Sequence, residues 1–178
     1  MKDEPSADGA ELLRAGRFRV VRRLEHHPGG TRVREVVEHP GSVVVVPMVS
    51  ADEVCLVEVV RVAVGETLLE LPAGTLDRVE STAAAAAREL AEETGYRAAR
   101  IEPAAMFWMS PGILRERMHL FVAEGLVVGR QQLEPGEQIR TRVVPWREAI
   151  GMCLDGTIED AKTIAGLLLV DARRRRRD

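Results

Sequence analysis

The sequence of 178 residues is short of the residue types that mark several protein classes. Its two cysteines, Cys55 and Cys153, can form neither a disulfide framework nor a four-cysteine zinc site. Its apolar runs fall far short of the ~20 residues that span a bilayer, and residues 1–9 are too polar to form a signal peptide. These absences predict a soluble, cytoplasmic protein without a membrane partner.

Lysine is equally scarce, since 23 of the 25 basic residues are arginine. The formal net charge is −3, and residues 173–178 hold five arginines and one aspartate, which together contribute +4. The rest of the chain therefore carries −7, which makes it a poor surface for nucleic acid. We expect no nucleic-acid partner and interpret the arginine tail of residues 173–178 as a solvated segment; a tail that binds RNA or acidic lipid is the alternative.

The length and the 46% of hydrophobic residues suit one domain with a buried core. Residues 1–15 are expected to be a flexible, polar lead-in. We expect helices over 81–94, 145–154 and 158–173, and strands over 18–24, 32–39, 42–48, 54–60, 67–71, 97–103, 105–109, 118–127 and 139–145. This order of elements predicts an α/β or α+β sandwich around a mixed sheet.

The segment 81–94 gives the clearest helix prediction, because it is rich in alanine and has no internal glycine or proline. Ser81 or Thr82 can cap its start, and Gly95 can end it. We expect Leu90 and the alanines at 83, 84, 87 and 91 to cover the inner side of this helix. Its acidic residues would then lie on the open side.

Carboxylates crowd one patch of this helix. Glu89 and Glu93 are four residues apart and share a face, and Glu92 is three residues from Glu89. Arg88 can pair with Glu92 and with Glu80 in the preceding loop. The three carboxylates repel one another unless a cation lies there, and hard divalent ions such as Mg²⁺ choose oxygen ligands. An ordinary solvated helix with ion pairs is the alternative.

Gly74, Glu80 and the run Arg88-Glu89-Leu90-Ala91-Glu92-Glu93-Thr94-Gly95-Tyr96 resemble the Nudix box, and every fixed position of that pattern is met. The resemblance implies an α/β/α sandwich over residues 41–172. It also implies hydrolysis of a nucleoside diphosphate linked to another moiety, with Mg²⁺ or Mn²⁺ as the cofactor. The structural positions of the box are Gly74, Glu80, Arg88 and Gly95.

Segments outside the box are similar to the ADP-ribose pyrophosphatase branch of this family. They are residues 34–39, 57–61 and 69–74, together with Ser110-Pro111-Gly112 and the run 160–163. The likeness implies that ADP-ribose or a related nucleoside diphosphate sugar is cleaved, giving AMP and ribose 5-phosphate. It further implies an additional antiparallel strand region over residues 16–40, which is exchanged between the subunits of a homodimer.

The same resemblance assigns site residues. The metal ligands are expected to be the Ala73 carbonyl and the carboxylates of Glu89, Glu92, Glu93 and Glu137. The catalytic residues are expected to be Glu92, Glu134 and Glu137. Either Glu134 or Glu137 takes the proton from water, with Glu134 favoured. The substrate-binding residues are expected to be Arg34, Arg61, Thr75, Ser110, Gly112 and Glu116. A planar guanidinium fork makes arginine well suited to a phosphate oxygen.

One departure from the branch concerns substrate choice. Val59 and Val60 stand where polar or aromatic residues are common, which opens the choice to another nucleotide sugar, NADH or a dinucleotide. NADH-type relatives usually carry a four-cysteine zinc ribbon, which two cysteines cannot build. A non-catalytic sensor would tend to lose box glutamates, and here they are all present. Phe107 and Trp108 could stack on a base, but we interpret both as core, since the chain has few aromatic residues.

Overall fold

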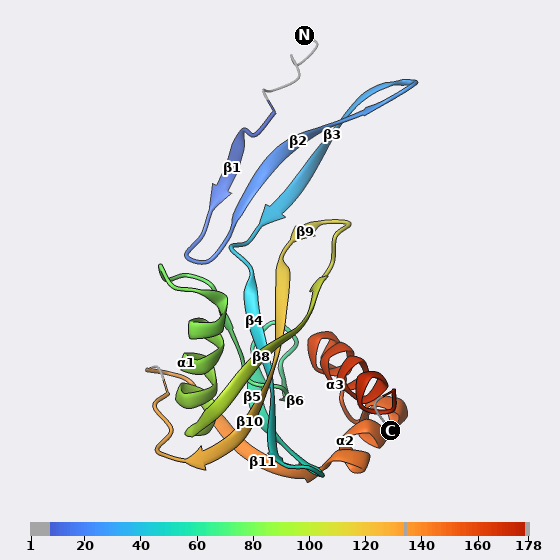
Figure 1. Ribbon diagram of the computed structural model, residues 1–178. Coiled ribbons are helices and arrows are strands. Elements are labelled where there is room, and N and C mark those ends of the chain that lie inside the picture. The colour runs from blue at the N-terminus through green and yellow to red at the C-terminus, as the bar shows by residue number, and fades with distance from the viewer. Residues whose placement is uncertain (1–7, 134, 177–178) are drawn as a thin grey trace.

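The computed structural model describes residues 8–133 and 135–176, and these form two mixed sheets and three helices (Figure 1). The helices are α1 Thr82–Thr94, α2 Trp146–Asp155 and α3 Ala161–Arg174. The strands are β1 Glu11–Arg14, β2 Arg19–His27, β3 Gly30–Glu38, β4 Ser42–Ser50, β5 Glu53–Arg61, β6 Glu66–Glu70, β7 Ala73–Thr75, β8 Tyr96–Trp108, β9 Leu114–Arg115, β10 Arg117–Val128 and β11 Ile139–Pro145. The predicted α/β fold with a mixed sheet is confirmed.

Strand β4 lies at the centre of the body, and both of its faces are buried. Its sheet has the order β11-β5-β4-β10-β8, with β6 on β5 and β7 on β4, and β4 runs parallel to β10. Val43 and Val45 pack into a core with Leu90 of α1, whereas Val44 and Val46 pack into the core that also contains α2 and α3 residues. Successive side chains of β4 therefore point to opposite faces of the sheet, and each face packs against helices.

Helix α1 begins and ends where the sequence predicts. The Ser81 side chain caps it by accepting a bond from the Ala84 N–H at 3.1 Å, and Gly95 ends it in the left-handed conformation with φ 77°. The prediction of its inner face is wrong in part. Besides Leu90, the buried residues are Ala85, Ala86 and Glu93, so the helix is rotated from the expected orientation and carries one carboxylate into the protein.

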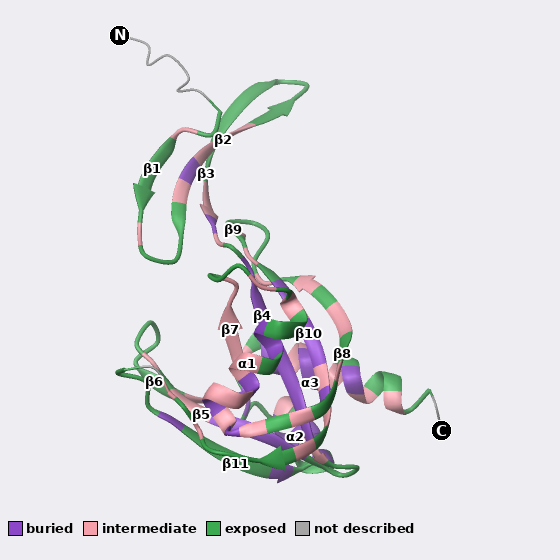
Figure 2. Ribbon diagram, turned by 60° about the vertical axis from the view of Figure 1, so that its left-hand side comes forward, coloured by how far each residue is buried: buried purple, intermediate pink, exposed green. Residues whose placement is uncertain are grey.

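Strands β1, β2 and β3 form an arm that stands away from the body and meets it through the short strand β9 (Figures 1 and 2). Strands β2 and β3 form a hairpin around residues 28–29. Glu38, at the end of β3, is only 8% exposed. Its carboxylate accepts bonds from Arg19 at 2.8 Å and Arg23 at 2.5 Å, and Arg115 of β9 lies 3.4 Å away. This ion cluster fixes the arm where it joins the body.

Part of the polar lead-in expected over residues 1–15 forms a strand, and residues 1–7 lie outside the described residues. Glu11–Arg14 forms strand β1, which pairs antiparallel with β2. All four of its residues are exposed, so the segment has no alternation that would have indicated a strand. Pairing along the edge of β2 provides the stabilisation that local sequence preference lacks.

Strand β8 is continuous where two strands were expected, over residues 97–103 and 105–109. Pro103 is accommodated at a register shift in the pairing with β10, and Ala104 is left without an opposite residue. Bulges are the places where a paired strand tolerates proline.

The closing helices follow the prediction with small shifts. Helix α3 starts at Ala161 instead of residue 158, because Asp160 caps it by accepting a bond from the Thr163 N–H at 2.9 Å. It continues to Arg174, so it includes the first two arginines of the expected tail. None of the helices in residues 8–133 and 135–176 has the length and apolar character needed to cross a bilayer.

The two adjacent aromatic residues of β8 differ in environment. Phe107 packs half-buried against the larger core, as interpreted from the sequence. Trp108 is 43% exposed, and the guanidinium carbon of Arg117 lies 4.8 Å from its ring centroid. The core interpretation of Trp108 is therefore wrong, because successive residues of a strand face opposite sides.

Leu120→Ala is expected to destabilise the fold by about 2–5 kcal/mol, the usual cost of a cavity in a packed core. Leu120 is fully buried on β10 between β4 and the helices. Leu154→Ala, at a position 75% exposed, is the control and should change stability by no more than about 0.5 kcal/mol. Urea denaturation followed by circular dichroism measures both. Equal effects in the two variants would contradict the burial of Leu120.

Candidate functional site

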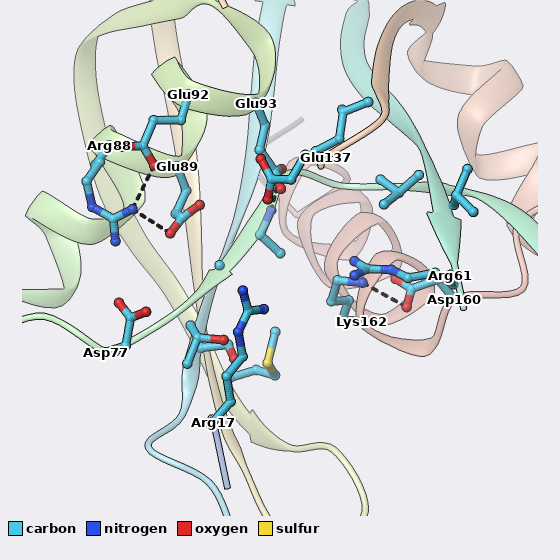
Figure 3. Close-up of a pocket in the computed structure, with 18 of the residues that line it drawn as sticks. Arg17, Arg61, Asp77, Arg88, Glu89, Glu92, Glu93, Glu137, Asp160 and Lys162 are labelled. Carbon is cyan, nitrogen blue, oxygen red and sulfur yellow. Dashed lines mark hydrogen bonds and ion pairs between the residues drawn. The ribbon is translucent and has the colours of Figure 1, made fainter. Parts of the chain in front are cut away.

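A pocket of about 570 Å³ lies where helix α1 approaches strands β5 and β7 (Figure 3). Arg88, Glu89 and Glu92 lie on one side, and Arg61, Asp160 and Lys162 lie on the other. Glu93 and Glu137 lie between these groups. The pocket therefore has a carboxylate-rich side opposite a side with two cations.

Arg88 holds the carboxylates of the first group together. Its Nη1 donates to Glu89 at 2.7 Å and to Glu92 at 2.8 Å, and its Nη2 donates to Glu80 at 2.8 Å. The pairs predicted with Glu92 and Glu80 are both present. Burial disfavours the charge on Arg88, but the three glutamates outweigh burial and raise its pKa. Arg88 is thus the cation that keeps these like charges close to one another.

Strand β7 passes so close to α1 that position 74 has room only for glycine. A Cβ on Gly74 would lie 1.9 Å from Cδ of Glu89. The neighbouring Ala73 N–H donates to Oε2 of Glu93 at 3.0 Å. Since β7 is itself paired with β4, the backbone of Ala73 and Gly74 holds two glutamates of α1 against the central sheet.

Glu93 is a carboxylate in an unfavourable place for a charge. It is 7% exposed, and burial raises its pKa to about 8, with the Ala73 N–H opposing and Glu89 and Glu137 adding to the shift. Burial also raises the pKa of Glu89, against the effect of Arg88. Burial therefore disfavours the charged forms of Glu93 and Glu89. A cation bound there would favour the ionised carboxylates.

The donor set fits a hard divalent cation, although its oxygens are turned toward protein partners. Among the described residues, no three carboxylate, imidazole or thiol groups converge as a preformed metal cluster. Glu89 and Glu92 face Arg88, and Glu93 faces the Ala73 N–H. All three line the same pocket as Glu137, and carboxylate oxygens are the ligands that Mg²⁺ and Mn²⁺ prefer.

The structure brings most of the predicted site residues together. Those that line the pocket are Arg61, Ala73, Gly74, Thr75, Arg88, Glu89, Glu92, Glu93, Glu116 and Glu137. Glu116 also accepts a hydrogen bond from the Ser42 hydroxyl at 2.7 Å. Glu80 bonds to Arg88, and Gly95 ends α1, so both have structural positions.

Three predicted substrate residues are not among those that line the pocket. Ser110 and Gly112 lie in the turn before β9. Arg34 lies on β3 in the arm, where its Nε donates to Glu25 at 2.8 Å. Glu134, the favoured general base, lies outside the described residues. The single chain therefore forms the carboxylate centre but does not gather every residue expected around the substrate.

The structure also adds pocket residues that sequence reasoning missed. Among them are Arg17, Ser42, Asp77, Asp160 and Lys162. Arg17 lies in the turn between β1 and β2, and its side chain points from the arm into the pocket (Figure 3). The run 160–163 carried a signal through its likeness to the branch, but nothing in the sequence indicated a role for Arg17.

Glu93→Gln is expected to flatten the pH dependence of stability, measured with a chelator present. The pKa of Glu93 is raised to about 8 from 4.5, so the folded state binds more protons than the unfolded state between these values. Stability therefore falls as pH rises through this window, and glutamine removes that part of the fall. Thermal melts at about pH 5 and about pH 9 should show a smaller drop in Tm for the variant. An equal drop in both proteins would argue against the shifted pKa.

Proteins of known family are similar to this chain in sequence. A family model for the NUDIX domain matches residues 38–167. The chain is 38% identical over 168 residues to an ADP-ribose pyrophosphatase of Mycobacterium tuberculosis, covering 92% of this chain and 81% of that protein. It is 34% identical over 145 residues to an ADP-ribose pyrophosphatase of Bacillus subtilis, covering 80% of this chain and 78% of that protein.

A solved structure is similar in fold. It is described as an ADP compounds hydrolase, and it matches with a TM-score of 0.80, 22% identity and coverage of 98% of both chains. Identity at that level supports the fold alone. The family model and the two sequence relatives, each matched over most of its length, lead further: the chain belongs to the Nudix family of hydrolases.

Proposed function

We propose that the protein hydrolyses the pyrophosphate bond of ADP-ribose, or of a related nucleoside diphosphate sugar, to give AMP and ribose 5-phosphate. The observation that carries this proposal is the pocket in which the α1 carboxylates lie opposite Arg61. Such a pocket suits a diphosphate held between bound cations and a guanidinium. The relatives from M. tuberculosis and B. subtilis are ADP-ribose pyrophosphatases, which supports the same substrate.

The proposal includes a divalent cation, Mg²⁺ or Mn²⁺. Its ligands would come from the Ala73 carbonyl and from Glu89, Glu92, Glu93 and Glu137. When bound, the cation neutralises phosphate charge and lowers the pKa of the attacking water. The raised pKa of Glu93 supports this assignment, because a buried carboxylate gains a partner for its charge when it releases its proton to bind a metal.

The protein's own side chains hold the diphosphate and accept a proton. Arg61 binds a phosphate oxygen with its guanidinium. Glu134, or Glu137 in its place, accepts the proton of the attacking water. The water oxygen bonds to one phosphorus while the bond from that phosphorus to the bridging oxygen breaks, and the electron pair leaves with the second phosphate. Glu92 lies next to Glu89 on the carboxylate patch and would act as a further ligand of the cation.

The rest of the substrate extends from this centre toward β4 and β9. Thr75 and Glu116 line the pocket and are assigned to the substrate, with Glu116 near the terminal ribose. Ser110 and Gly112 belong to the adjoining turn and would contact the same end. Val59 and Val60 also line the pocket, so apolar surface is available on the β5 side.

A homodimer is part of the proposal, because the arm exposes apolar side chains that suit a protein partner. Leu12, Leu13, Phe18 and Val33 are each more than two-fifths exposed. Arg34 lies on the same arm and is absent from the pocket of its own chain. Pairing of two arms would cover the apolar residues and could bring Arg34 to the partner's pocket.

A product assay tests the activity. The purified chain with Mg²⁺ is offered ADP-ribose, ADP-glucose, GDP-mannose, NADH and diadenosine polyphosphates, and release of AMP or GMP is followed. We expect ADP-ribose to be cleaved fastest. Glu89→Gln should lower kcat by about 10²-fold or more, since it removes a ligand from the reacting centre.

The matched control is Glu124→Gln, an acidic residue on β10 outside the pocket, which should keep full activity. If ADP-ribose ranked last among the substrates, the proposed substrate would be wrong. If Glu89→Gln kept normal turnover, the assignment of the carboxylate patch would be wrong.

The dimer gives a separate prediction. Light scattering after gel filtration should give twice the mass of one chain, which is 19.6 kDa. Val33→Glu places a charge on the exposed apolar surface of the arm and should yield monomers with reduced kcat/KM. Val128→Glu, at an exposed position at the end of β10, is the control and should remain dimeric. A monomeric unmodified chain with full activity would contradict the shared site.

A further inference from the structure

The start of helix α3 carries a buried ion cluster that faces the pocket. Glu70 is 1% exposed and accepts bonds from both Arg61 and Lys162. Lys162 is 9% exposed and also donates to Asp160 at 2.9 Å. The cluster thus contains two cations and two carboxylates, contributed by β5, β6 and the start of α3. The chemistry described above uses only Arg61.

The Glu70 carboxylate sets the direction of Arg61. The guanidinium donates to Glu70 through Nε at 2.7 Å and through Nη2 at 2.6 Å, so the two planar groups meet fork to fork. This geometry restricts the guanidinium to one orientation. Its Nη1 is not used in the pair.

Lys162 holds the same carboxylate as Arg61. Burial would raise the pKa of Glu70, but Arg61 and Lys162 together hold it below its usual range. Lys162 thus holds the carboxylate that orients Arg61. Asp160 keeps Lys162 in place, and its second oxygen accepts bonds from the Thr163 N–H at 2.9 Å and the Thr163 hydroxyl at 2.6 Å.

The same end of α3 also holds the segment that leads to the Nudix box. The Leu71 N–H donates to the Thr163 hydroxyl oxygen at 2.8 Å. Two residues later, the Ala73 N–H donates to Glu93 at 3.0 Å. Residues 70–73 are therefore fixed at three points between α3 and α1, so a shift of α3 would reach both Arg61 and the backbone beside the carboxylates.

We propose that Lys162 is a positioning residue for the reaction: it holds Glu70 so that Arg61 keeps its orientation toward the substrate diphosphate. The inference rests on the proposed function, which gives Arg61 its phosphate. It assigns Lys162 no contact with the substrate. Its effect must therefore depend on the presence of Arg61.

A double-mutant cycle tests this dependence. The proteins are the unmodified chain, Lys162→Met, Arg61→Met and the double variant, assayed for ADP-ribose hydrolysis. We expect each single change to lower kcat/KM by about tenfold or more, and the double variant to be no worse than Arg61→Met by more than about twofold. Lys162→Arg should recover most of the activity, because it returns a cation to Glu70. Losses that multiply in the double variant would overturn the proposal.

Two controls separate this effect from loss of fold or of charge. Arg173→Met removes one positive charge from an exposed position of the same helix and should leave kcat/KM unchanged. If Lys162→Met lowers the Tm too far for assay, Glu70→Gln/Lys162→Met removes the unpaired buried carboxylate as well. That variant should fold and still show low kcat/KM; normal activity in it would also overturn the proposal.

A second readout separates this inference from the proposed substrate. The affinity of the same proteins for inorganic pyrophosphate, measured by calorimetry, requires no turnover. We expect the Kd to rise about tenfold in each single variant and no further in the double variant. If no nucleotide were hydrolysed but this pattern held, the proposed function would fail and the positioning role would stand. If hydrolysis were normal and Lys162→Met bound pyrophosphate as tightly as the unmodified chain, the positioning role would fail and the proposed function would stand.

Discussion

The site depends on the close approach of strand β7 to helix α1, which is possible because position 74 has no side chain. That approach places the Ala73 N–H on Glu93 and leaves Glu89 against the backbone of Gly74. Both elements are supported by β4, which pairs with β7 and packs against Leu90 of α1. A strand buried on both faces is thus the rigid base on which the carboxylates are held.

Electrostatic balance is achieved differently on the two sides of the pocket. On α1, Arg88 binds three glutamates, while burial raises the pKa of Glu93 to about 8. Near α3, each buried carboxylate has a cationic partner, and Glu70 is kept ionised. On the α1 side one guanidinium is therefore shared by several carboxylates, whereas the α3 cluster has a cation for each carboxylate. This contrast gives the pocket a direction along which a diphosphate and its cations can be arranged.

Most of the fold and the carboxylate centre could be predicted from sequence, because they follow from local rules. The Ser81 cap, the Gly95 stop and the spacing of Glu89, Glu92 and Glu93 are properties of one helix. The missing features depend on distant contacts. Strand β1 exists through pairing with β2, and Arg17 reaches the pocket through the placement of the arm. The inner face of α1 was predicted wrongly because alanines lie all around the helix.

The junction at Glu38 has a consequence for how the sequence can vary over evolution. Three arginines from β2 and β9 share this single carboxylate, so the loss of any one leaves two cations in contact with it. Loss of Glu38 would instead leave three positive charges crowded without a counterion. The junction should therefore tolerate the substitution of any one arginine but not the substitution of Glu38. Substitutions without effect on function should therefore accumulate at the arginines and not at Glu38.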